Sequence, residues 1–191
     1  GFNIHPVSAK NTMINAALVA MEFNNMLPAG ETPRDTDGYE GFYHLTRMSG
    51  NVEKANLNYI LRDHDADNIA RRQEIMKEIA KKLNEKYGAG TVNLTLKEEY
   101  RNMAEKIREN FHLIENAKKA CENMGIVPKI QPIRGGTDGA RLSFMGLPCP
   151  NLGTGGYAFH GPYEHITVEG MDKSVEILME LVKIYGIIKK E

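Results

Sequence analysis

The sequence has 191 residues, enough for one large domain or two small ones with a buried core. A net charge of -1 excludes the basic footprint of a nucleic-acid-binding protein and a polybasic membrane patch. With 41% apolar and 26% charged residues the composition is ordinary for a globular protein, and no apolar run approaches the roughly 20 residues of a membrane span.

The cysteines and the N-terminus indicate the compartment. Cys121 and Cys149 lie far apart and form no C-x-x-C motif, which predicts a reducing, cytoplasmic environment. The first ten residues, GFNIHPVSAK, have no apolar region after a basic start and so are not a signal peptide. They also lack an initiator methionine and begin at a strand-to-loop transition. We therefore expect the sequence to be part of a longer protein.

The first hundred residues alternate between strand and helix patterns. We expect, in chain order, a strand end at 1–4, a helix from Ser8 to Leu27, strands at 42–47 and 57–61 around a turn at 49–51, a helix from Asp63 or Asp65 to Tyr87, and a strand at 92–96. This (β)αββαβ order is the ferredoxin-like pattern, with four strands in one sheet and two helices on one face. The Lys and Arg residues of the second helix predict a solvated face or a dimer contact.

After residue 102 the pattern changes. We expect a helix over 111–124, a short strand over 127–133, a short helix over 138–145 and a closing helix through Val175 and Val182. This order belongs to a layered α/β domain but has too few strands to close a core. The predicted fold class is therefore α/β (α+β), with a division into residues 1–101 and 102–191.

A glycine-rich stretch at 133–170 carries the candidate chemistry. In R-G-G-T-D, a loop at the entry of a helix offers backbone N–H groups to an anion, and Arg134 can clamp a carboxylate. A tight turn with Thr137 or Asp138 as helix cap explains the same residues. His160, in F-H-G-P-Y-E-H, is either a metal ligand or a hydrogen-bonded loop histidine, and Pro162 excludes a helical H-E-x-x-H zinc motif.

Five segments together resemble the tripeptide aminopeptidases of the M20 dizinc peptidase family. They are N-I-H-P-V-S-A-K-N-T-M-I-N-A-A, G-F-Y-H-L-T-R-M-S-G, Y-I-L-R-D-H-D, I-R-G-G-T-D-G-A-R-L-S-F-M-G-L-P-C-P-N-L and F-H-G-P-Y-E-H. The resemblance covers essentially the whole chain but only the C-terminal half of family members. It implies a ferredoxin-like lid or dimerisation domain over 1–101, followed by the C-terminal part of an α/β catalytic domain over 102–191.

The resemblance also implies a reaction and its residues. The reaction is hydrolysis of the N-terminal residue of a tripeptide, by a homodimer with two Zn²⁺ ions in each active site. His160 corresponds to the last zinc ligand. His5 corresponds to a lid histidine that reaches an active site and polarises the scissile carbonyl. In dimeric relatives, this is the active site of the partner subunit. The positions that correspond to substrate binding are Arg62, Arg134, Gly135, Gly136 and Thr137.

The other zinc ligands and the general-base glutamate of the family lie in a half outside this sequence. One histidine cannot hold two zinc ions. We therefore expect the 191-residue chain alone to bind no zinc pair and to cleave nothing.

Two alternatives stay open at this point. The chain could be a stand-alone lid or dimerisation module without catalysis, or part of another M20-type dizinc carboxypeptidase or deacylase. The glycine-rich stretch argues against the first, because dimerisation alone does not require R-G-G-T-D-G or F-H-G. The preference for tripeptides rests on the resemblance alone.

Overall fold

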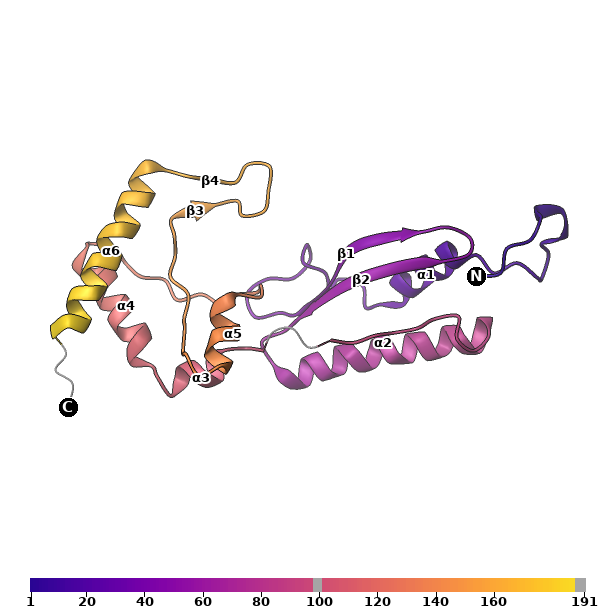
Figure 1. The fold of residues 1–191 in the computed structure, drawn as a ribbon, viewed down its shortest axis with the longest axis horizontal. Coiled ribbons are helices and arrows are strands. Elements are labelled where there is room, and N and C mark those ends of the chain that lie inside the picture. Colours follow the sequence, from indigo (N-terminus) through magenta and orange to yellow (C-terminus); the bar gives the residue numbers. More distant parts are fainter. Residues whose placement is uncertain (98–100, 188–191) are drawn as a thin grey trace. The chain divides into compact units, whose positions relative to one another are not determined.

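A computed structural model describes residues 1–97 and 101–187, and the chain divides into two compact units. Unit 1 consists of Gly1–Glu98 with Pro132–Gly135, and unit 2 of Glu99–Gln131 with Gly136–Glu191. Unit 1 contains η1 (Pro6–Ser8), α1 (Ala16–Met26), β1 (Phe42–Gly50), β2 (Ala55–Arg62) and α2 (Ala66–Tyr87) (Figure 1). Unit 2 contains α3 (Ala104–Arg108), α4 (His112–Asn123), α5 (Asp138–Phe144), β3 (Gly156–Tyr157), β4 (His165–Ile166) and α6 (Val168–Ile187). The predicted mixed α/β class is confirmed.

A β-hairpin forms the sheet of unit 1. β1 pairs antiparallel with β2, and the register sets Phe42 opposite Arg62 at the open end. The register shifts between Leu45 and Arg47, as in a β-bulge. Asn51 makes the turn, because its side-chain oxygen accepts hydrogen bonds from two backbone N–H groups. The two strands predicted from alternation therefore form, and each is longer than predicted.

The helix α1 begins later than the sequence predicts. Its N-cap is Asn15, not Ser8, because the Asn15 side-chain oxygen accepts hydrogen bonds from the N–H groups of Ala17 (3.0 Å) and Leu18 (3.3 Å). These are groups that the first turn of a helix leaves unpaired. Ser8 instead belongs to the short 3₁₀ turn η1.

The helix α2 forms as predicted. Asp65 caps its start by accepting a hydrogen bond from the N–H of Asn68 at 3.0 Å, and Gly88, with a φ of 102°, ends it. A positive φ at this position suits glycine. The cap signals in the sequence therefore locate both ends of α2.

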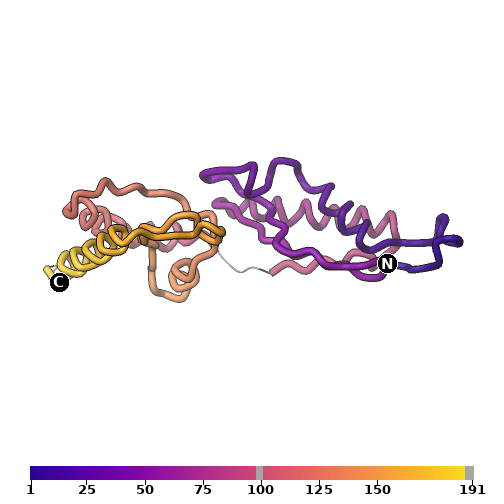
Figure 2. The backbone as a smooth tube through the Cα atoms, turned by 90° about the horizontal axis from the view of Figure 1, so that it is seen from above, coloured from indigo at the N-terminus to yellow at the C-terminus, as the bar shows by residue number. Residues whose placement is uncertain are grey.

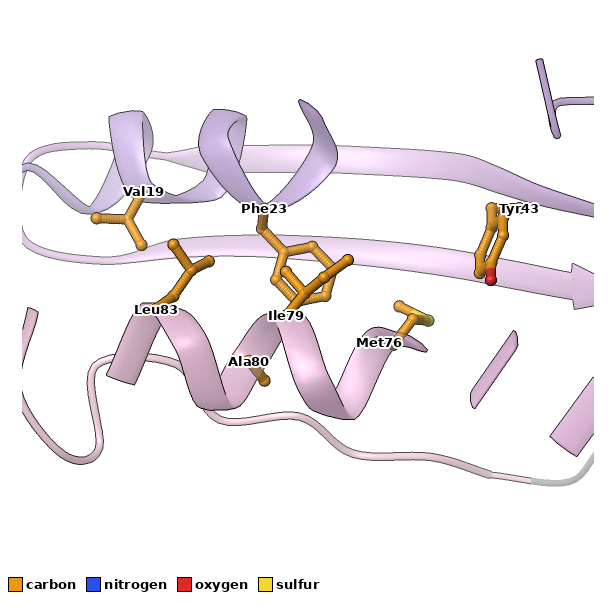
Figure 3. Close-up of a cluster of buried hydrophobic side chains, with 7 residues drawn as sticks. All are labelled: Val19, Phe23, Tyr43, Met76, Ile79, Ala80 and Leu83. Atoms are coloured by element: carbon orange, nitrogen blue, oxygen red, sulfur yellow. The ribbon is translucent and has the colours of Figure 1, made fainter. Parts of the chain in front are cut away.

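The core of unit 1 lies between α1, α2 and the hairpin. In Figure 3, the labelled side chains of α1 and α2 point toward one another. Every second residue of the central part of β2, Leu57, Tyr59 and Leu61, is partly buried against this cluster, so both helices pack on one face of the hairpin. The cluster comprises Val19, Phe23, Tyr43, Met76, Ile79, Ala80 and Leu83.

Among the described residues, the sheet of unit 1 has two strands and not the predicted four. Residues 92–96 pair with no strand: Val92 is bonded through its N–H and C=O to the side chain of Asn84 on α2, at 2.8 and 2.9 Å. Residues 1–4 form one isolated bridge, between Phe2 and Ile14. An alternating pattern of apolar residues is compatible with a β-strand, but a strand also requires a neighbouring strand as its hydrogen-bond partner.

Unit 2 is mainly helical. α4 and α6 lie side by side in both views (Figure 1 and Figure 2), and the Asn123 side chain donates a hydrogen bond of 2.8 Å to Glu180. The helices predicted at 111–124, at 138–145 and at the end of the chain all form. The strand predicted at 127–133 does not, and the two-residue strands β3 and β4 pair instead. None of the described helices combines the length and apolar character needed to cross a membrane.

Candidate active site

His160 lies in the loop that joins β3 to β4. Its side chain is exposed, and its φ of 63° is a left-handed conformation that non-glycine residues rarely adopt. Its backbone N–H donates a hydrogen bond of 3.0 Å to the carboxylate of Glu164. At the base of the loop the rings of Tyr157 and His165 stack with their centroids 5.3 Å apart. Local contacts thus hold the loop while the His160 imidazole remains open to a ligand.

His5 is exposed at the other end of the chain, in unit 1. Its Nδ1 accepts a hydrogen bond from the N–H of Val7 at 3.3 Å, which fixes the ring at the start of η1. The segment that carries it is attached to the hairpin turn, because the Gly1 ammonium donates to the Glu53 carbonyl at 2.7 Å. His5 is therefore at the turn end of the hairpin.

Arg62 lies at the opposite, open end of the same hairpin. It is the last residue of β2, is partly buried, and donates a hydrogen bond of 3.1 Å to the carbonyl of Leu61. Since the strands rise about 3.3 Å per residue, the hairpin separates His5 from Arg62 by roughly 25 Å. Within one protomer, unit 1 does not bring these two predicted site residues together.

Arg134 binds the loop that precedes β1. Its Nη1 donates to the Thr36 carbonyl (2.7 Å), and its Nη2 donates to Thr36 Oγ1 (2.5 Å) and to the Glu40 carbonyl (3.2 Å). The guanidinium also lies over the Phe42 ring, while the buried Nε has no hydrogen-bond partner in the described structure. These contacts tie residues 132–135 to unit 1, whereas the sequence placed them with the second part of the chain.

Arg62 and Arg134 share a neighbour. Phe42 is the register partner of Arg62 in the hairpin, and the centre of the Arg134 guanidinium is 5.0 Å from the Phe42 ring centroid. The structure therefore brings two of the predicted substrate-binding residues to the same end of unit 1.

Gly135, Gly136 and Thr137 continue from Arg134 into α5. Thr137 is the N-cap of this helix: its Oγ1 accepts hydrogen bonds from the Ala140 N–H (3.2 Å) and the Asn151 amide (3.3 Å). Of the two caps that the sequence allowed, the structure thus selects Thr137. Both glycines are exposed, so their backbone groups are accessible.

A buried ion cluster around Arg72 was not predicted from the sequence. Arg72, only 4% exposed, donates to Asp63 from Nε (3.3 Å) and Nη2 (3.2 Å) and also forms an ion pair with Glu31. Its guanidinium lies 5.2 Å from the centroid of the Tyr43 ring. Gly41 is required here, because a Cβ at this position would collide with the Asp63 carboxylate. The sequence assigned Asp63 only to helix capping, and no local pattern indicates a partner nine residues away.

Two hollows on unit 1 contain none of the predicted site residues. One, of about 820 Å³, lies between α2 and residues 89–96, and the other, of about 660 Å³, lies between the end of α1 and the loop at 28–34. The candidate chemistry therefore lies outside them.

The predicted site residues are divided between the two units. His5, Arg62, Arg134 and Gly135 belong to unit 1, whereas Gly136, Thr137 and His160 belong to unit 2. Within residues 1–97 and 101–187, no three His, Cys, Asp or Glu side chains gather in a way that could hold a metal ion. The described residues thus offer the His160 imidazole but no complete zinc site.

Comparison with known proteins identifies the class first. Residues 1–91 match the family model of the M20 peptidase dimerisation domain. The fold agrees: a tripeptidase of Staphylococcus aureus superposes with a TM-score of 0.68 at 17% identity, over 93% of this chain and 47% of that one. An aminopeptidase PepT of Bacillus cereus gives 0.61 at 19% identity, over 94% and 48%.

The particular protein that the chain resembles is Peptidase T. It is 55% identical to Peptidase T of Clostridium perfringens over 186 residues, which are 97% of this chain and 46% of that protein. It is 51% identical to Peptidase T of Caldanaerobacter subterraneus over the same share of each. The resemblance predicted from the motifs is confirmed, and the chain spans about half the length of these relatives.

Proposed function

We propose that the chain is part of an M20-type tripeptide aminopeptidase, which hydrolyses the N-terminal residue from tripeptides. The observation that carries this proposal is the 55% identity to Peptidase T over 97% of the chain. Since the chain spans 46% of that relative, the activity is proposed for a protein that also contains the remaining part.

In that enzyme we assign His160 as one ligand of a Zn²⁺ pair. When bound, such ions lower the pKa of a bound water and so supply hydroxide at neutral pH. The exposed imidazole of His160 suits this task, because neutral imidazole is a common zinc ligand. Since the described residues offer no cluster of three ligands, the remaining ligands belong to the part of the enzyme outside the match.

We further propose a homodimer in which His5 serves the active site of the partner subunit. Two observations support this: residues 1–91 match a dimerisation domain, and His5 is exposed at the hairpin end remote from Arg62. A neutral or protonated imidazole that donates a hydrogen bond to the scissile carbonyl would polarise it for attack.

For substrate binding we propose Arg62 and Arg134, with Gly135, Gly136 and Thr137. A guanidinium matches a peptide carboxylate through two parallel hydrogen bonds, and exposed glycine N–H groups can bind a peptide carbonyl. Arg134 donates Nη1 and Nη2 to Thr36 and Glu40, so a substrate carboxylate would have to displace these contacts. Its role therefore involves the loop at 36–40 as well as the substrate.

We place the enzyme in the cytoplasm, since both cysteines of this chain are free. A stand-alone dimerisation module is the second candidate function, favoured by the match of residues 1–91 alone. The two differ in whether residues 133–165 contribute to a catalytic site.

The test is a fusion protein in which this chain replaces the matched 186 residues of Clostridium perfringens Peptidase T. We expect it to release the N-terminal alanine from Ala-Ala-Ala and to leave N-acetyl-Ala-Ala-Ala intact. Cleavage of the acetylated peptide would indicate a carboxypeptidase or deacylase, and a folded, dimeric but inactive fusion would indicate a dimerisation module.

A further inference from the structure

The open end of the hairpin lies between two sets of arginines. Tyr43 belongs to the core cluster on the face that α1 and α2 cover, and its ring centroid is 5.2 Å from the guanidinium of Arg72. Consecutive strand residues point to opposite faces, so Phe42 lies on the outer face, where Arg134 covers its ring. Arg62 is the register partner of Phe42 and shares that outer face. Arg72 is thus on the helix-covered face, opposite the proposed substrate-binding residues.

Arg72 binds the end of β2 through Asp63, the residue that follows Arg62. Its Nε (3.3 Å) and Nη2 (3.2 Å) both donate to Oδ2 of Asp63. The other carboxylate oxygen, Oδ1, accepts a hydrogen bond from the N–H of Asp65 at 3.0 Å. The carboxylate also lies against Gly41, where it leaves no room for a Cβ. These contacts fix the chain directly after Arg62.

The same guanidinium binds the start of β1 through Glu31. Arg72 Nη1 forms an ion pair with the Glu31 carboxylate, and the Glu31 carbonyl accepts a hydrogen bond of 2.8 Å from the N–H of Tyr43. The Tyr43 hydroxyl in turn donates to the carbonyl of Arg72 at 3.4 Å. One side chain of α2 therefore connects the ends of both strands.

Stability alone does not explain this arrangement. Apolar side chains of similar volume often stabilise a core as well as a buried ion pair does. A planar guanidinium that binds two carboxylates differs from them in fixing the direction of each partner. Such a group suits a place where the exact position of neighbouring residues matters, and the side chain of Arg72 is only 5% exposed.

We propose that Arg72 is a positioning residue for Arg62: it fixes the two strand ends, so that the Arg62 guanidinium meets the tripeptide in one orientation. Since Arg72 is buried on the opposite face, it acts through Arg62 and does not contact the substrate. The substrate then binds a site that is already ordered, which favours a low KM. This role rests on the proposed function.

The test is Arg72→Lys in the Clostridium perfringens fusion protein. Lysine keeps the positive charge, but one ammonium cannot hold both Asp63 and Glu31 in the same planar arrangement. The matched control is Arg71→Lys, the same substitution at the next residue, whose 47% exposed side chain also pairs with Glu31. KM and kcat for Ala-Ala-Ala are measured for each variant, with and without Arg62→Ala.

We expect Arg72→Lys to raise KM by about tenfold or more with a smaller change in kcat, and Arg71→Lys to change neither. In the Arg62→Ala background, Arg72→Lys should raise KM by less than about threefold, because the residue that it positions is absent. An equal factor in both backgrounds, or a normal KM for Arg72→Lys, would overturn the proposal. Should Arg72→Lys not fold, Glu31→Gln makes the same comparison, since it keeps the shape of the partner and removes its charge.

Hydrogen exchange in the isolated chain separates this proposal from the proposed function, because it requires no activity. We expect Arg72→Lys to accelerate exchange of the Tyr43 N–H at least about tenfold relative to that of Leu83, a buried residue farther along α2. Arg71→Lys should leave this ratio unchanged. An unchanged ratio in Arg72→Lys would overturn the proposal. A wild-type fusion that does not cleave Ala-Ala-Ala would instead count against the proposed function, and the exchange ratio would still decide whether Arg72 fixes the strand ends.

Discussion

The guanidinium of Arg134 lies 5.0 Å from the ring centroid of Phe42 and holds the loop in front of that residue by hydrogen bonds to Thr36 and Glu40. The next residue, Tyr43, has the guanidinium of Arg72 at 5.2 Å. Consecutive strand residues point to opposite faces, so two arginines from distant parts of the chain fix the loop before β1 from two sides.

Replacing Arg134 should loosen this loop. Arg134→Ala removes the hydrogen bonds to Thr36 and Glu40 and the contact with Phe42, and we expect the free energy of unfolding of unit 1 to fall by about 2 kcal/mol. The free energy of unfolding of Arg134→Lys should lie between those of Arg134→Ala and the wild type, because one ammonium group cannot reproduce the planar fork of the guanidinium. Urea denaturation measures the effect, with exposed Arg34→Ala in the same loop as control. An Arg134→Ala protein that unfolds like the wild type would contradict the role of this contact.

Mutation of the Arg72 cluster should destabilise unit 1 more than mutation of Arg134. The side chains of Arg72 and Asp63 are only 5% and 4% exposed, so Arg72→Ala leaves Asp63 as a buried, unpaired charge, at a cost of about 3–5 kcal/mol. The exposed pair of Lys77 and Glu74 is the control, and Lys77→Ala should cost less than about 1 kcal/mol. Chemical denaturation of both variants makes the comparison, and similar losses for the two would argue against a buried cluster.

The Tyr59 phenol should ionise at a higher pH than an ordinary tyrosine. Burial raises its pKa to about 12, against an ordinary value near 10. Because the folded state favours the neutral phenol, the contribution of Tyr59 to stability is complete below pH of about 10 and is lost as the pH rises toward 12. Tyrosinate absorbance measures this directly: Tyr59→Phe should remove one late-titrating group. If every tyrosine of the folded chain ionises near pH 10, the burial of Tyr59 is wrong.

The isolated 191-residue chain should be inactive. Its described residues contain no group of three metal ligands, so we expect no bound zinc pair after dialysis against zinc and no alanine released from Ala-Ala-Ala. Metal analysis of the dialysed protein and an amino-acid assay test the two halves of this expectation. Measurable release of alanine would refute it.

Local signals predicted both ends of α2 and the cap of α5, but not the start of α1, which Asn15 caps and not Ser8. Asp65 and Gly88 locate the ends of α2, and Thr137 is one of the two caps expected for α5. The strand prediction at 92–96 failed because a strand depends on distant partners: these residues alternate like a strand but bond to Asn84 on α2, and no strand lies beside them in the described structure.

The candidate site shows the same limit. His160 and Arg134 were recognisable from their motifs, whereas the contacts of Arg134 with Thr36 join residues 98 positions apart. The ion pair of Arg72 with Glu31 spans 41 positions. Neither pairing has a periodic or local signature, since both follow from how the loop before β1 folds back. Motifs therefore predicted the candidate site residues, and only the fold could supply their partners.

The central claim is that His160 is a zinc ligand of a tripeptide aminopeptidase, and its direct test is His160→Ala in the Clostridium perfringens fusion protein. We expect kcat/KM for Ala-Ala-Ala to fall by more than about a hundredfold, since outer-shell mutations alone cause losses of up to that size, and bound zinc to fall with it. The exposed His112→Ala should leave both unchanged. A folded His160→Ala fusion that keeps its zinc and its activity would contradict the account.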